Sequence, residues 1–325
     1  MNKLNTRNVF IDNLKGLLIY CVVLGHICEN YEMAHPNLKF LIFFIYLFHM
    51  PCFIYISGYF SKKYDFRKNV KLIYQFVVFG VVYCFIVNKF PRITARFQIA
   101  QPPVALWYLL ALFYWRTIIN FIKTKKIKTV ITISFICAIF VGCLKNVGTY
   151  FSLARAVGFF PFFLLGFYSN ESLLEKIKNI NKVVIFLLLI IILISTFAIV
   201  SKDLIPLMFQ WASKSFDELG ISFAKGILFR VIFFVLEICS CIVVINLIPK
   251  RETIFTKFGE NSIIIFGFHT SLVFSIKYFI NDVKYKGEIY LFVLLVSFAI
   301  VFVLNLKPIQ KLYKILMKPY EKMSE

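Results

Sequence analysis

Long apolar runs recur along almost the whole chain, and they decide the fold class before any motif is considered. A transmembrane helix needs about 20 mostly apolar residues, and a helix satisfies its own backbone hydrogen bonds in lipid. Ten runs reach spanning length, so we predict an all-α, polytopic membrane protein with about ten transmembrane helices. The runs cover residues 9–29, 38–60, 70–89, 104–122, 129–145, 153–170, 182–201, 226–248, 261–280 and 289–306.

The composition leaves little chain for anything besides this bundle. Of 325 residues, 60% are hydrophobic and 16% are charged, and the mean hydropathy is +0.80. A soluble globule is excluded because its apolar fraction is nearer to about half. Ten spans would use roughly 200 positions. We therefore predict a single integral-membrane domain over residues 1–325, which ends in a short basic cytoplasmic tail over residues 307–325.

The basic residues predict the topology. The chain has 37 Lys and Arg against 16 Asp and Glu, a formal charge of +21, and cytoplasmic loops retain the excess of Lys and Arg. One alternate set of loops, which includes both chain ends, carries 22 of them, and the opposite set carries 12. We predict an N-in and C-in protein of the inner (plasma) membrane. Nucleic-acid binding is not expected, because the basic residues are scattered over alternate loops.

The first span carries three ionisable residues on one face. Asp12, Lys15 and His26 fall within about 60° of one another, and Lys15 and His26 stand roughly 16 Å apart along the axis. Each costs about 2.5 to 3.5 kcal/mol to insert, which makes it a functional candidate. The structural alternative is an i, i+3 pair of Asp12 with a snorkelling Lys15, and a His26 bonded to a neighbouring helix. An imidazole also moves protons readily near neutral pH.

Several segments resemble the integral-membrane acyltransferase-3 family. DNLKGLLIYCVVLGH is similar to its first-helix signature, in which a basic residue precedes a histidine by eleven positions. FHMPCFIYISGYF at 48–60 is similar to its second-helix signature, which ends in Ser-Gly before a basic loop. Further similar segments are LWYLLALFYWR at 106–116, RAVGFFPFFLLGFY at 155–168 and NSIIIFGFHTSL at 261–272. Many members have arginine where this chain has Lys15. Lysine keeps the positive charge but lacks the bidentate fork of arginine.

The resemblance implies a membrane O-acyltransferase. Such an enzyme moves an acetyl group from cytoplasmic acetyl-CoA to a hydroxyl of a sugar or lipid-linked glycan of the envelope. By motif, His26 is the catalytic histidine, and Lys15, with Asp12 beside it, is its basic companion at the acyl-CoA. The motif leaves open whether His26 acts as a general base or carries the acetyl group covalently.

Other basic residues are candidates for holding the acyl-CoA. Phosphates are bound by several point charges or forks, and basic residues follow the second span and end the fourth. The loop after the second span has two alternative roles, which are to set the topology and to attract anionic membrane lipids. The alternative for Arg116 is that its side chain snorkels to the cytoplasmic surface. The donor candidates are Lys15, Ser57, Lys62, Lys63, Arg67, Lys68 and Arg116.

The acceptor candidates are polar or aromatic residues within the spans. They are His49, Trp107, Arg230, Glu237 and His269. Structural alternatives are a backbone-bonded His49, an aromatic-belt Trp107, and interhelical ion pairs for Arg230 and Glu237. The longest outer loop, residues 202–225, is the expected place of acceptor recognition.

Neither a metal site nor a transport pathway is favoured. The eight cysteines lie within or at the ends of spans, with no CxxC and no Cys/His cluster at zinc spacing, so no metal cofactor is expected. The alternative function is a glycan or lipid transporter or flippase that uses the same polar stripe. Transporters often contain inverted repeats with broken helices. No repeat is recognisable here, and Pro51 and Pro161 do not occupy corresponding halves.

Overall fold

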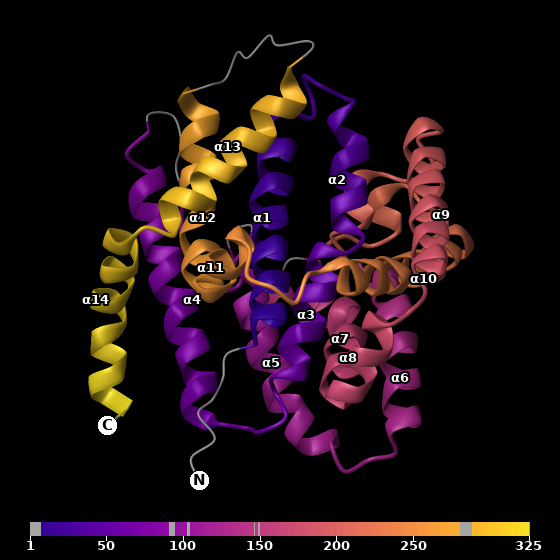
Figure 1. Ribbon diagram of the computed structural model, residues 1–325, viewed down its shortest axis with the longest axis horizontal. Coiled ribbons are helices and arrows are strands. Elements are labelled where there is room, and N and C mark those ends of the chain that lie inside the picture. Colours follow the sequence, from indigo (N-terminus) through magenta and orange to yellow (C-terminus); the bar gives the residue numbers. More distant parts are fainter. Residues whose placement is uncertain are drawn as a thin grey trace.

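The structure is a computed structural model that describes residues 8–90, 95–102, 105–145, 147–148, 150–279 and 288–324, and within these ranges it contains helices and no strands (Figure 1). This confirms the all-α class. The ends of the predicted domain, residues 1–7 and 325, lie outside the described ranges, as does residue 280 of the ninth predicted span.

Each predicted span corresponds to an apolar helix or helix pair. The apolar helices are α1 (Val9–Tyr31), α2 (Leu38–Tyr46), α3 (His49–Tyr59), α4 (Phe66–Val87), α5 (Trp107–Ile122), α6 (Ile127–Phe140), α7 (Leu153–Tyr168), α9 (Lys182–Ser201), α10 (Phe223–Leu247), α12 (Ser262–Phe279) and α13 (Ile289–Leu304). Three further helices, α8 (Glu171–Lys178), α11 (Ile254–Glu260) and α14 (Lys307–Ser324), lie between or after them.

The number of membrane crossings stays a prediction. Within the described residues, seven helices are long and apolar enough to cross a membrane, with α2 and α3 taken together, and an eighth is α13 with α14, which are bent by 56°. The remaining apolar helices, α5 and α6, are shorter. The chain is therefore a multi-pass membrane protein. In Figure 1 the α3–α4 and α5–α6 connections lie at the lower end and the α1–α2 connection at the upper end, and the N-in and C-in orientation remains an expectation.

The second predicted span, residues 38–60, is broken into α2 and α3. Pro51 follows the break at Leu47 and Phe48. A proline inside a helix donates no hydrogen bond, and its ring clashes with the carbonyl four residues earlier, here that of Leu47. The break turns His49 and Tyr46 toward each other, with ring centroids 4.6 Å apart.

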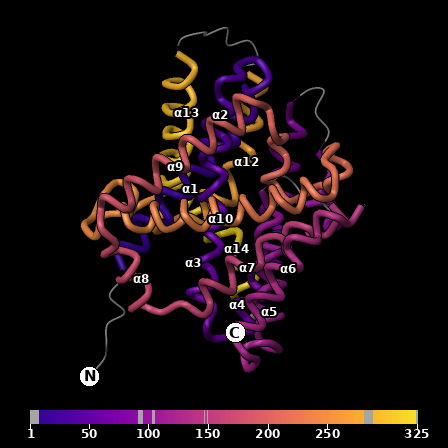
Figure 2. The backbone as a smooth tube through the Cα atoms, turned by 90° about the vertical axis from the view of Figure 1, so that its right-hand side faces the viewer, coloured from indigo at the N-terminus to yellow at the C-terminus, as the bar shows by residue number. Residues whose placement is uncertain are grey.

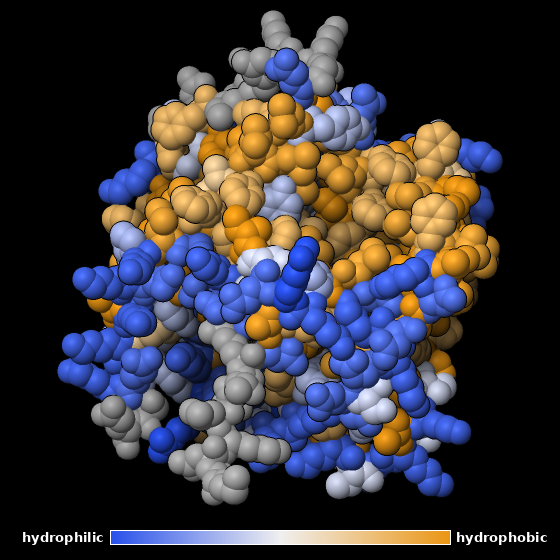
Figure 3. All heavy atoms as spheres, in the orientation of Figure 1, coloured by the Kyte–Doolittle hydropathy of each residue, from blue (hydrophilic) through white to orange (hydrophobic). Residues whose placement is uncertain are grey.

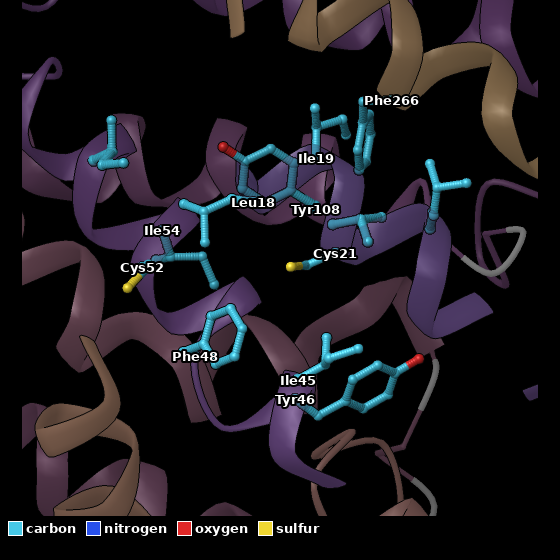
Figure 4. Packing of buried hydrophobic residues seen from close by; sticks show 14 of the residues in the cluster. Leu18, Ile19, Cys21, Ile45, Tyr46, Phe48, Cys52, Ile54, Tyr108 and Phe266 are labelled. Atoms are coloured by element: carbon cyan, nitrogen blue, oxygen red, sulfur yellow. The ribbon is translucent and has the colours of Figure 1, made fainter. Parts of the chain in front are cut away.

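The first helix is the centre of the bundle. α1 packs against α2, α3, α11, α12 and α13 (Figure 1). Its apolar side chains meet those of α2 and α3 in a core that α5 and α12 complete (Figure 4). The residues labelled there are Leu18, Ile19, Cys21, Ile45, Tyr46, Phe48, Cys52, Ile54, Tyr108 and Phe266. A polar residue of α1 is therefore held by neighbours on most sides.

The helices α3 and α7 approach so closely at two points that only glycine fits. A side chain at Gly58 of α3 would strike the Phe163 carbonyl of α7, and a side chain at Gly166 of α7 would strike the Tyr55 carbonyl of α3. These are the glycines of the Ser-Gly segment and of the 155–168 segment. Their role is structural, because they let two backbones touch.

The surface separates into two zones. In Figure 3, hydrophobic side chains cover the upper part of the face shown and hydrophilic side chains most of its lower part. α9 exposes large apolar residues, including Phe186, Ile194 and Phe197, as a lipid-facing helix would. Figure 2 shows α10 crossing the middle of the molecule at a steep inclination to α1. The predicted tail forms α14, which returns to α4 through a hydrogen bond from Gln75 to the Tyr313 hydroxyl, 2.7 Å.

Candidate functional site

A cavity of about 370 Å³ opens around the last turns of α1. This volume lies within the range of small-molecule sites. Its polar lining residues are His26, Glu29, Tyr46, His49, Ser152, Arg155 and Gln210, and its aromatic walls include Trp107, Phe159, Trp211 and Phe266. The cavity therefore joins parts of the chain from α1 to α12. The predicted topology puts this end of α1 in the outer half of the membrane.

His26 is held by a carboxylate. Its Nδ1 lies 2.9 Å from Oε2 of Glu29, one turn further along α1. A carboxylate can only accept, so Nδ1 is the donor, and in the neutral imidazole Nε2 keeps its lone pair. The other oxygen of Glu29 accepts a hydrogen bond from the Tyr46 hydroxyl. Glu29 is thus fixed from both sides, and it sets the tautomer and the orientation of His26.

The other two histidines of the prediction lie beside this pair. The His269 ring stacks on His26 with centroids 5.4 Å apart and an angle of 22° between the planes. His269 Nδ1 donates to the Phe266 carbonyl of its own helix α12 at 2.7 Å, and His49 Nδ1 of α3 donates to the Ile45 carbonyl of α2 at 3.0 Å. His49 lines the cavity, whereas His269 is fully buried behind His26. His49 therefore makes the backbone hydrogen bond of the structural alternative, and its role at the site stays a prediction.

A second charged residue faces Glu29. Arg155, near the start of α7, lines the same cavity and interacts electrostatically with Glu29. Its guanidinium lies 5.4 Å from the centroid of the Trp107 ring, within the range of a cation–π contact. The Trp107 ring in turn stacks on Phe159 at 5.5 Å. The cavity thus contains the base His26, the cation Arg155 and the aromatic rings of Trp107 and Phe159.

The loop of residues 202–225, predicted to lie on the outer side, contributes a turn to the cavity wall. Gln210 and Trp211 follow the short turn Leu207–Phe209 and line the cavity. Arg230 of α10 donates to the Phe209 carbonyl at 3.3 Å, and its guanidinium lies 4.4 Å from the Phe209 ring centroid. Arg230 therefore supports this turn.

The prediction for Arg230 and Glu237 changes accordingly. Neither residue lines the cavity, and the described part of the chain contains no ion pair between them or with another helix. Instead of the interhelical ion pair predicted as its structural alternative, Arg230 contacts the carbonyl and the aromatic ring of Phe209. Both side chains are buried.

The predicted donor residues lie apart from the cavity. Lys15 pairs with Asp12 at 2.7 Å, in the first turns of α1, and neither lines the cavity. These two residues therefore form the local pair of the structural alternative, and their catalytic role stays a prediction. Lys62 donates to the Ser169 carbonyl, and its ammonium lies 5.0 Å from the Tyr59 ring centroid. Of the basic loop, Lys63, Arg67 and Lys68 are exposed, and Lys68 lies 3.4 Å from the Asp65 carboxylate.

A chain of polar contacts runs between α3 and α5 on the basic side. Arg116 donates through Nε to the Ser61 hydroxyl at 3.1 Å, and Ser61 donates to the Ser57 carbonyl at 2.5 Å. The Ser57 hydroxyl meets the Tyr108 hydroxyl at 2.5 Å. Tyr108 packs edge-on against Phe266 of the cavity wall, with centroids 5.4 Å apart. This chain connects two predicted donor residues to the cavity wall.

Sequence reasoning missed Glu29, Tyr46, Arg155 and Gln210. The signal for Glu29 was present, because an acidic residue three positions after His26 shares its face. Arg155 lies inside the predicted span 153–170, but the count of charges assigned it to an outer loop. Gln210 stands in a loop without periodicity. No group of His, Cys, Asp and Glu suited to a metal occurs in the described ranges.

The chain matches the acyltransferase domain that defines the acyltransferase-3 family over residues 8–306, nearly its whole length. No curated protein and no solved structure matches the chain significantly. The matched region contains all of the cavity residues. The chain belongs to the acyltransferase-3 family and is a membrane acyltransferase.

Proposed function

We propose that the protein transfers an acetyl group from cytoplasmic acetyl-CoA to a hydroxyl of an envelope or exported glycan. The observation that carries this proposal is the His26–Glu29 pair, 2.9 Å apart, inside a cavity with aromatic walls. A base oriented by a carboxylate is the arrangement that activates a hydroxyl nucleophile. The aromatic walls suit the apolar faces of a sugar ring. The protein would act in the inner membrane.

His26 would act through Nε2 as a general base. The acceptor hydroxyl attacks the thioester carbonyl carbon, and Nε2 takes its proton. The C–S bond then breaks, an ester C–O bond remains, and the imidazolium returns the proton to the departing CoA thiolate. Glu29 stabilises the imidazolium that exists between these two transfers. Arg155, on the cavity wall, would stabilise the negative charge that develops on the thioester oxygen.

The donor would enter from the basic side. In this proposal Lys62, Lys63, Arg67 and Lys68 attract the CoA phosphates, with Lys15 also on the cytoplasmic side. Arg116, Ser61 and Ser57 form the polar chain that leads to Tyr108 and the cavity wall. The pantetheine arm would follow this chain, and membrane lipids would surround the remaining helices.

The acceptor would enter from the opposite side. Trp107 and His49 line the cavity and would contact the sugar, and His269 would support His26 from behind. Arg230 and Glu237 would contribute indirectly through α10. A transporter would instead need a path for the glycan through the molecule. The experiment below therefore also measures glycan export.

The proposal is tested with the purified protein reconstituted into membranes from a deletion strain of the source cell. Labelled acetyl-CoA is supplied on the cytoplasmic side, and alkali-labile label on the glycan is counted. We expect label to appear only with the protein present. Loss of glycan export in the deletion strain with unchanged acetylation would instead identify a transporter and overturn the proposal.

A further inference from the structure

Two residues of the cavity wall each have a buried side-chain atom without a hydrogen-bond partner among the described residues. The atoms are Oε1 of Gln210, whose side chain belongs to a residue only 4% exposed, and Nε1 of Trp211. Both residues line the cavity that contains His26. A buried polar group without a partner costs about 1 to 3 kcal/mol, so a water or a ligand that supplies the missing hydrogen bond stabilises the structure.

The turn that carries this pair is held in place. Gln210 donates through Nε2 to the Phe43 carbonyl at 3.0 Å. This contact assigns the amide orientation, because the carbonyl can only accept, and Oε1 is left as the acceptor. Arg230 holds the Phe209 carbonyl from α10. Ala212, directly after Trp211, is left-handed with φ of 49°, a conformation that costs energy in a residue other than glycine.

The two atoms are chemically complementary. Gln210 Oε1 can only accept a hydrogen bond, and Trp211 Nε1 can only donate one. A hydroxyl group does both, so the hydroxyls of a sugar can satisfy either atom. A carboxylate would satisfy Trp211 and repel Gln210, and an ammonium would do the reverse. The pair therefore favours a neutral polyol.

We propose that Gln210 and Trp211 form the acceptor subsite and bind a hydroxyl of a neutral sugar next to the one that is acetylated. This inference rests on the proposed function and adds the residues that recognise the acceptor. The pair comes from residues 202–225, on the predicted outer side, whereas the donor chain from Arg116 to Tyr108 comes from the basic side. The amides of a pantetheine arm offer similar groups, so the test separates the donor from the acceptor.

The test compares Trp211→Phe and Gln210→Met with the wild type in the reconstituted membranes. Trp211→Phe keeps an aromatic ring and removes only the donor N–H. We expect a roughly tenfold lower rate of acetylation of the endogenous glycan in each variant, the value of one neutral hydrogen bond. The KM and the calorimetric Kd for acetyl-CoA should stay unchanged. Gln98→Met, at an exposed glutamine of the 95–102 segment, is the matched control and should retain the wild-type rate.

Three results would overturn the subsite. An unchanged glycan rate in Trp211→Phe and Gln210→Met would show that the pair binds nothing in the reaction. A tenfold weaker Kd for acetyl-CoA with each variant would assign the pair to the pantetheine arm. Absence of transfer by the wild type would refute the proposed function itself, and this result is recognised separately because it does not depend on a variant. Elution of each variant as a single species in detergent shows that it has folded.

Discussion

Replacing His26 with alanine is expected to lower acetyl transfer by about 10² to 10⁴-fold, the usual contribution of acid–base catalysis. The cause is chemical, because His26 is paired with a carboxylate that stabilises its imidazolium. His49 and His269 both donate through Nδ1 to backbone carbonyls and have no carboxylate partner in the described residues. The measurement is alkali-labile label on the glycan after incubation with labelled acetyl-CoA.

The same substitution should leave the amount of protein in the membrane unchanged. The His26 side chain is 17% exposed and faces the cavity, so its removal leaves few packing contacts unmade. His35→Ala, in the α1–α2 connection, removes a histidine outside the cavity and should keep the wild-type rate. Acetylation at the wild-type level by the His26→Ala protein would refute its catalytic role.

The largest effect on folding is expected from Gly166→Leu. The Gly166 position lies against the backbone carbonyl of Tyr55, which is part of α3 and cannot move aside as a flexible side chain would. Overpacking a core costs about 1 to 3 kcal/mol when side chains can adjust, and separating two helices at a backbone contact costs more. We expect the variant to be absent from the membrane, or to aggregate on solubilisation.

The matched control for this prediction is Val157→Leu on the same helix, at a half-buried position. It adds one methylene group at a position that is not fully buried, and it should accumulate as the wild type does. Size-exclusion elution and the melting temperature in detergent compare the two. A Gly166→Leu protein with the melting temperature of the wild type would contradict the close approach of α3 and α7.

Much of the fold could be predicted because membrane insertion imposes a simple pattern. Apolar runs of spanning length gave the helices, and the structure places an apolar helix in each. The break between α2 and α3 was visible in principle at Pro51, but the hydropathy of residues 38–60 does not reveal it, because an apolar run continues across the break. The polar helices α8 and α11 carry no hydropathy signal of a span.

The site was predictable only in part. His26 was found because its type and its motif are unusual within a span. Lys15 shares its face, yet it lies at the other end of α1, since a shared face does not bring residues to the same depth. Gln210 and Trp211 reach the cavity through the support of Arg230 and Phe43. These contacts join distant parts of the chain, and no local pattern records them.

The central claim is that His26 and Glu29 act as one catalytic unit. The direct measurement is the transfer rate of His26→Ala, Glu29→Gln and the double variant under identical conditions. Glu29→Gln removes the charge that stabilises the imidazolium, so it should lower the rate by about 10²-fold. Groups that act as a unit are not additive, so the double variant should stay within about threefold of His26→Ala. Losses that multiply in the double variant, or a Glu29→Gln rate equal to that of the wild type, would contradict the claim.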